Sequence, residues 1–223
     1  MRSLRDAFGQ FATGVAVVTT ATPDGDRAGV TVNSFTSVSL DPPLVLWCLS
    51  RRAPSAPVFL EAGRFAVNVL AAGQDHLSRR FAAPSPDKFA GVETRPLPGG
   101  LPALAGALAS FACRTVTAHD GGDHIIFVGE VEHFHRSEGD PLVFHSGGYG
   151  MFSALPENPG IPPTPAAPVA PGSQRTPGTP RTSGSPRVPR AVRAPGRAGH
   201  REESGSTVFA DRSHRPDQIR SRS

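Results

Sequence analysis

Small polar side chains occupy six of the ten positions of the stretch TVNSFTSVSL at residues 31–40, although its alternation is typical of a β-strand. On a strand, Asn33, Phe35, Ser37 and Ser39 would share one face. Short hydroxyl and amide groups donate and accept hydrogen bonds without filling space, so they suit the wall of a site for a polar planar ligand. The spacing alone favours the plainer alternative, which is an edge strand rich in Ser and Thr.

A second polar segment follows the apolar run at residues 44–49. Ser50, Arg51, Arg52 and Ser55 stand where a buried strand would pass into a loop. A guanidinium matches the oxygens of a phosphate, and backbone N–H groups near the start of a following helix add partial positive charge. The segment therefore indicates a phosphate contact, and a solvated basic loop is the alternative.

Metal and thiol chemistry have weaker support. The turn HDGGDH at residues 119–124 and the pair His133 and His135 contain metal-binding residue types, but neither shows a convincing metal-site spacing. Cys48 and Cys113 each lie in a strand-like apolar run, so we expect two buried thiols without a disulfide. No metal site is expected.

The elements that must position these residues are predicted to be short strands joined by hairpins. Strands do not alternate with helices, so a parallel doubly wound sheet is not expected. The pattern favours a mainly β fold, an antiparallel barrel with two or three accessory helices. The helices are predicted near residues 3–13, at 58–63 and from residue 73. The strands are predicted at residues 15–22, 27–40, 44–50 and 64–70, on both sides of a turn at 120–123, and at 141–150.

The composition divides the chain near residue 155. Residues 1–154 hold 12 Lys and Arg against 14 Asp and Glu, whereas residues 155–223 hold 11 Arg, five acidic residues and 13 of the 24 prolines. The second part has few large apolar residues, so it cannot bury enough surface to offset its ordering entropy. We therefore predict one compact domain at 1–154 and a disordered tail, rich in Pro, Arg, Gly and Ser, at 155–223.

The net positive charge belongs to this tail and says nothing about partners of the main domain, for which no nucleic-acid partner is expected. The tail arginines are spread among Pro, Gly and Ser, and Phe209 is the single aromatic residue among them, so a plain extension is favoured over a nucleic-acid-binding segment. No run approaches the ~18 apolar residues that span a membrane. The N-terminus has no apolar signal-peptide core. A cytoplasmic protein without a membrane partner is expected.

Seven segments occur in an order and spacing that resemble the flavin reductase family, whose fold is the FMN-binding split barrel: FATGVAVVTT, GVTVNSFTSVSLDPPLVLWCLSRR, FAVNVL, RRFA, DKF, GDHIIFVGEV and PLVFHSGGY. This family includes the small reductase components of two-component flavin-dependent monooxygenases. The resemblance covers residues 4–152. It implies a homodimer of six-stranded antiparallel split β-barrels with a few accessory helices.

The resemblance also implies an NAD(P)H-dependent flavin reductase. FMN or FAD would bind near the dimer interface, accept hydride from NADH or NADPH, and leave in reduced form for a partner monooxygenase. The alternative is a non-catalytic flavin-binding or electron-carrier module of the same fold. The histidine in GDH favours the reductase.

Family positions matched in this sequence imply the roles of individual residues. The isoalloxazine edge and ribityl chain would contact Asn33, Ser34, Phe35, Thr36, Ser37 and Ser39. The ribityl and phosphate end would contact Cys48, Leu49, Ser50, Arg51, Arg52 and Ser55. Phe81 and Lys88 would lie near the flavin or its phosphate, His124 would serve catalysis on the nicotinamide side, and Tyr149 would close the pocket. The sequence departs from the family at Ala53-Pro54, because the proline removes a backbone donor near the phosphate.

Overall fold

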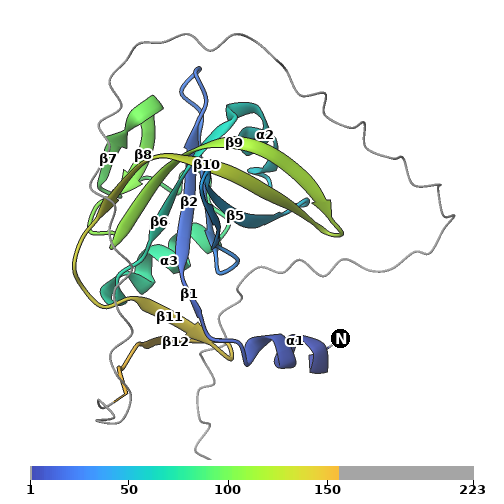
Figure 1. The fold of residues 1–223 in the computed structure, drawn as a ribbon, viewed down its shortest axis with the longest axis vertical. Helices are drawn as coiled ribbons and strands as arrows, with labels where there is room; N and C mark the ends of the chain where they lie inside the picture. The colour runs from blue at the N-terminus through green and yellow to red at the C-terminus, as the bar shows by residue number, and fades with distance from the viewer. Residues whose placement is uncertain (1, 156–223) are drawn as a thin grey trace, which may run out of the picture. The chain divides into compact units, whose positions relative to one another are not determined.

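The computed structural model describes residues 2–155, so the tail predicted at 155–223 lies, apart from its first residue, outside the described part. The main feature is an antiparallel sheet with the strand order β3-β2-β6-β9-β10-β5-β4 (Figure 1). The predicted mainly β, antiparallel fold is confirmed, with seven strands in this sheet where six were expected. The strands are β2 (Ala16–Ala21), β3 (Arg27–Val32), β4 (Thr36–Leu40), β5 (Pro43–Ser50), β6 (Arg64–Val69), β9 (Ala109–Gly121) and β10 (His124–Arg136).

The two edge strands of this sheet, β3 and β4, follow each other directly in the chain. Only residues 33–35 separate them, yet β3 pairs with β2 and β4 pairs with β5. The sheet must therefore curl until its two edges come near each other, and β3 does contact β5. The prediction of one continuous strand at 27–40 is wrong, because the chain changes pairing partner at this crossover. The crossover at residues 33–35 is called the seam below.

Aromatic side chains fill the inside of the curled sheet. The Trp47 ring lies parallel to Phe127, with 4.7 Å between centroids, and meets Phe59 and Phe65 edge-on. All four side chains are fully buried. Such pairs add specific geometry to the burial of large apolar surface. This cluster fixes β5, β6, β10 and the helix after β5, and so it fixes the end of β5 where Ser50 and Arg52 lie.

Smaller elements surround the main sheet (Figure 1). Strand β1 (Thr13–Gly14) pairs with β11 (Leu142–His145), which pairs with β12 (Gly148–Met151). The hairpin of β7 (Thr94–Leu97) and β8 (Leu101–Leu104) was not predicted. The helices are α1 (Arg2–Gly9), α2 (Ala56–Ala62) and α3 (Asp75–Ala82), with single 3-10 turns at Ala72–Gln74 and Pro98–Gly100. Within the described residues, none of the helices has the length and apolar character needed to cross a membrane.

Candidate functional site

A cleft of about 1030 Å³ opens beside the seam. One wall is β3 with the first seam residues, a second is the end of β5 with the start of α2, and a third is the segment after α3 at residues 84–89. The first residue of β10 reaches its edge. Because the sheet curls, segments that are far apart in the sequence meet in this one place.

Nine of the sixteen predicted site residues line the cleft, so most segments singled out from the sequence converge there. These nine are Asn33, Ser34, Cys48, Leu49, Ser50, Arg52, Ser55, Lys88 and His124.

The remaining predicted residues near the seam do not line the cleft. Phe35 packs against the core, with its ring 5.8 Å from that of Phe111. Thr36 and Ser37 are exposed on the edge strand β4, and Ser39 is half-buried there. The Arg51 side chain turns away, where it pairs with Asp120 and donates to the carbonyl of Gly122.

Phe81 and Tyr149 stand behind the cleft wall. Phe81 is fully buried under the 84–89 segment. The Tyr149 hydroxyl lies 2.8 Å from the Ser78 hydroxyl, and the Ser78 carbonyl accepts a hydrogen bond from Thr31 Oγ1 at 2.6 Å. Since Thr31 lines the cleft, Tyr149 reaches that wall through α3 and not by direct contact.

The seam is held by a side chain that the sequence assigned to ligand binding. Ser34 Oγ accepts a hydrogen bond from the Cys48 N–H at 2.9 Å and lies 3.4 Å from the Cys48 carbonyl. These contacts occupy the Ser34 hydroxyl with the main chain of β5. The Asn33 side chain is exposed at the cleft, so its amide is free to meet a ligand.

Arg52 is the cation available at the end of β5. Within residues 2–155 its guanidinium makes no hydrogen bond or ion pair, whereas the neighbouring Arg51 is engaged with Asp120. Ser55 stands at the N-cap of α2 without a side-chain capping bond, so its hydroxyl is also free. A free guanidinium and a free hydroxyl in one cleft wall suit the oxygens of a phosphate.

Lys88 joins the 84–89 segment to the rest of the wall. Its Nζ donates to the carbonyl of Phe81 at 2.7 Å and to that of Gly29 at 3.3 Å. Burial lowers the pKa of Lys88. Gly29 permits this close packing, because a Cβ there would lie 2.5 Å from the Phe81 ring. Lys88 therefore acts first as a clamp on the wall that it also lines.

His124 begins β10 and pairs in register with Ser50 of β5, which brings it to the cleft edge. Its Nδ1 lies 2.7 Å from Asp123 Oδ1. The hydrogen bond from His124, together with the charge of its protonated ring, holds the pKa of the Asp123 carboxyl below the usual range. With Nδ1 occupied, Nε2 is the ring nitrogen left for a ligand.

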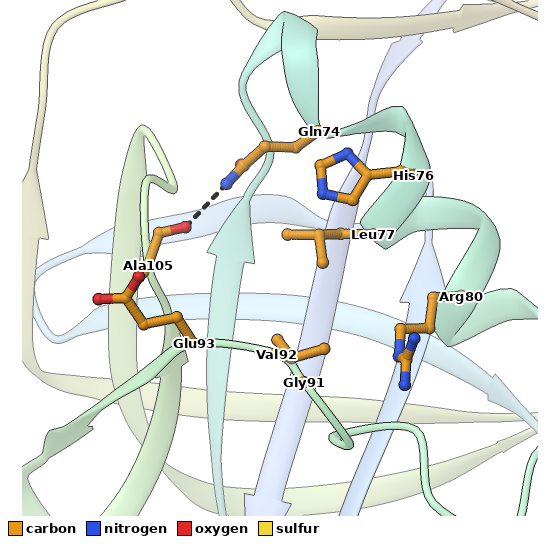
Figure 2. A pocket seen from close by; sticks show the side chains of 8 residues that line it. All are labelled: Gln74, His76, Leu77, Arg80, Gly91, Val92, Glu93 and Ala105. Atoms are coloured by element: carbon orange, nitrogen blue, oxygen red, sulfur yellow. Dashed lines mark hydrogen bonds between the residues drawn. The ribbon is translucent and has the colours of Figure 1, made fainter.

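A smaller pocket of about 350 Å³ lies beside α3 (Figure 2). It contains no predicted site residue. Gln74 donates to the Ala105 carbonyl at 2.8 Å across it. Arg80 donates to the carbonyls of Lys88 and Ala90, so it supports the 84–89 segment from behind. In the part of the chain that the structure describes, no group of three His, Cys, Asp or Glu side chains is placed to hold a metal ion.

Sequence reasoning missed Arg27, Asp26 and Phe89 as cleft residues. They come from the start of β3 and from the end of the 84–89 segment. Only the tertiary fold brings these stretches together, and no local pattern marks them. The proline pair at Pro84 and Pro86 was the one available signal of a fixed loop.

Comparison with known proteins agrees with this geometry. Residues 8–153 match the flavin reductase like domain, and the chain belongs to the flavin reductase family. It is 50% identical over 152 residues to the FMN reductase (NADH) SmoA of Agrobacterium fabrum, a match that covers 68% of this chain and 86% of that protein. It is 41% identical over 151 residues to HsaB of Mycobacterium tuberculosis, the reductase subunit of a flavin-dependent monooxygenase, covering 66% and 80%.

A solved structure has the same fold. The NADH:FAD oxidoreductase SgcE6 of Streptomyces globisporus, determined with NAD and FAD fragments, superposes with a TM-score of 0.65. The two sequences are 41% identical, and the match covers 68% of this chain and 92% of SgcE6. The family resemblance carried by the seven sequence segments is thus confirmed.

Proposed function

We propose that this chain is an NAD(P)H-dependent flavin reductase that transfers hydride from a nicotinamide to FMN or FAD and supplies reduced flavin to a partner monooxygenase. The observation that carries the proposal is the convergence of the seam, the end of β5 and His124 on one cleft, in a chain of the flavin reductase family. SmoA, HsaB and SgcE6 support the same reaction class.

The residues present fit a flavin. The seam and β5 offer a wall of main chain and small side chains, including Asn33 and Cys48, against which a planar ring can lie. Arg52 and Ser55 have free donors at the same wall for the phosphate. The flavin, when bound, supplies the hydride acceptor, and the nicotinamide supplies the hydride.

The side chains of this protein bind the flavin and the nicotinamide and orient them toward each other. Arg52 neutralises the phosphate, and Asn33 hydrogen-bonds the polar edge of the ring. His124, whose Nδ1 is engaged by Asp123, keeps Nε2 for the nicotinamide and positions it. No side chain needs to act as a nucleophile, because the protein must mainly hold the two rings in contact.

A homodimer is the second part of the proposal. Helix α1 exposes Leu4 and Phe8, the segment after it exposes Phe11, and the edge strand β4 exposes Val38 and Leu40, of which Leu40 is 92% exposed. Large apolar side chains left exposed in this number favour burial against a partner chain, because extended apolar surface is typical of an interface. Light scattering coupled to size exclusion checks the dimer, and a mass equal to one chain at micromolar concentration would contradict it.

Anaerobic mixing of the flavin-loaded protein with NADH, and separately with NADPH, tests the reductase. We expect the visible absorbance of oxidised flavin to disappear with at least one reductant. A protein that binds flavin but is bleached by neither reductant would be the non-catalytic flavin-binding module.

A further inference from the structure

The cleft extends beyond the residues assigned to the flavin ring and its first phosphate. A distal lobe, formed by residues 25–29 at the start of β3 and residues 84–89 after α3, lines the remainder of the cleft. Binding sites for drug-sized ligands occupy roughly 300–1000 Å³. A cleft of about 1030 Å³ lies at the upper end of this range, which suits a ligand as large as a dinucleotide.

A stacked pair of side chains dominates the distal lobe. The Arg27 guanidinium carbon lies 4.7 Å from the centroid of the Phe89 ring. Phe89 is only 6% exposed and meets Phe81 edge-on, with 5.1 Å between centroids. Arg27 is exposed, lines the cleft, and makes no ion pair or side-chain hydrogen bond within residues 2–155. The guanidinium thus lies over a buried ring and is otherwise exposed at the cleft, where a second planar group can stack on it.

The lobe is fixed without a ligand. Asp87 Oδ1 accepts a hydrogen bond from the Phe89 N–H at 2.8 Å. Arg80 holds the carbonyls of Lys88 and Ala90, and Lys88 Nζ reaches the Gly29 carbonyl on β3. Because the side chains of this site are already ordered, ligand binding carries no entropy cost for ordering them, and this cost does not reduce the affinity.

The charges in the lobe select the kind of ligand. Asp26 and Asp87 line the same lobe as Arg27 and Lys88, so the lobe holds two carboxylates and two cations. This balance gives little attraction for an additional dianionic phosphate. It suits a flat, uncharged ring that stacks on a guanidinium, which is how arginine recognises nucleobases.

We propose that Arg27, which lies over the Phe89 ring, binds the adenine ring of a dinucleotide, so that the distal lobe takes the adenosine half of FAD or of NADH. The inference rests on the proposed function and names the ligand part that discriminates dinucleotides from mononucleotides. FAD and NADH both contain an adenosine, so either can occupy the lobe. The experiment distinguishes which of the two does.

The test compares the purified full chain with Arg27→Met, which removes the planar cation but keeps the length of the side chain. Equilibrium titration measures the dissociation constants of FMN and FAD, and steady-state assays compare NADH with reduced nicotinamide mononucleotide. We expect Arg27→Met to weaken at least one dinucleotide about tenfold, the size of a lost base-stacking contact, and to leave both mononucleotides unchanged within about twofold. A loss confined to FAD assigns the lobe to the flavin, and a loss confined to NADH assigns it to the reductant.

Two further variants sharpen the test. Arg95→Met removes an exposed arginine of β7 that does not line the cleft, and it should change no affinity. Arg27→Lys keeps the charge without the plane and should lose the dinucleotide preference as Arg27→Met does. Unchanged FAD and NADH affinities in Arg27→Met, equal losses for mononucleotides and dinucleotides, or wild-type affinity in Arg27→Lys would each overturn the inference. Failure of the wild-type chain to bind any flavin would instead overturn the proposed function.

Discussion

The Ser34 hydroxyl accepts a hydrogen bond from the backbone N–H of Cys48 at 2.9 Å, and this contact ties the seam between the two edge strands to β5. The side chain that the sequence places against a ligand therefore also builds the wall of the cleft. A substitution at Ser34 should change stability and ligand affinity together.

Ser34→Ala leaves the Cys48 N–H without its acceptor at a half-buried position. We expect a loss of about 1 kcal/mol in the free energy of unfolding, together with weaker flavin binding. Urea denaturation and flavin titration measure the two effects. Ser37→Ala is the matched control, because the Ser37 side chain is exposed on β4 and outside the cleft. Equal effects of the two substitutions on flavin affinity would contradict the role of the seam.

Gly29→Ala introduces a Cβ at 2.5 Å from two atoms of the fully buried Phe81 ring. Overpacking of this kind costs about 1–3 kcal/mol, because the ring cannot move without disturbing Phe89 and the 84–89 segment. Thermal denaturation should show a clear decrease in Tm. In Gly14→Ala the new Cβ meets nothing within 4 Å, so its Tm should stay close to wild type. A tolerated Gly29→Ala would show that the wall is not packed as described.

His124→Gln removes the ring that Asp123 orients at the edge of the cleft. We expect the KM for NADH to rise or the rate of flavin reduction to fall on the order of tenfold, equivalent to one lost hydrogen bond to the reductant. The dissociation constant of the flavin should not change, which separates positioning of the nicotinamide from a general loss of structure. His119→Gln is the control, since His119 is exposed on β9 and does not line the cleft. Wild-type kinetics in His124→Gln would identify His124 as a turn residue without a role in the reaction.

Cys113 makes stability depend on pH in the alkaline range. Burial, with a smaller contribution from the charge of Glu132, raises the pKa of its thiol from 9.0 to about 12. The folded chain thus keeps a proton that the unfolded chain loses. This stabilisation is fully present below pH 9.0 and is lost as the pH rises towards about 12, by at most about 1.4 kcal/mol per pH unit.

The comparison of Cys113→Ala with wild type isolates this contribution. Urea denaturation across the alkaline range should give a shallower loss of stability for Cys113→Ala, while Cys48→Ala keeps the wild-type slope. Identical slopes for Cys113→Ala and wild type would show that the thiol ionises without a cost to the fold.

The sequence predicts the individual elements of this fold better than their pairing. The strand predicted at 44–50 corresponds to β5, and the turn predicted at 120–123 lies between β9 and β10. The seam was missed because alternation continues through residues 33–35, while the change of partner strand is a tertiary event. The β7–β8 hairpin was missed because Pro96 and Pro102 lie inside its strands, and proline argues against a strand in local reasoning.

The same limit applies to the candidate site. Arg52 stands just after a strand end, where residue type and position already indicate a phosphate contact, whereas His124 was assigned through the family resemblance. Phe81 and Tyr149 matched family positions, but the fold buries the first and links the second to the cleft only through Ser78. Arg27 could not be predicted, because its partner Phe89 is distant in the sequence and nothing near Arg27 marks a site.

Protection of the Cys48 thiol from alkylation by bound flavin tests the location of the flavin most directly. Cys48 is half-buried in the cleft wall, whereas Cys113 is fully buried with a raised pKa and serves as an internal control. Alkylation of the native protein, followed by mass spectrometry, gives the rate at each thiol with and without saturating flavin. We expect Cys48 to react in the free protein and to be protected when flavin is bound, while Cys113 stays unmodified in both. An unchanged rate at Cys48 in a protein shown by absorbance to be saturated with flavin would contradict the placement of the flavin in this cleft.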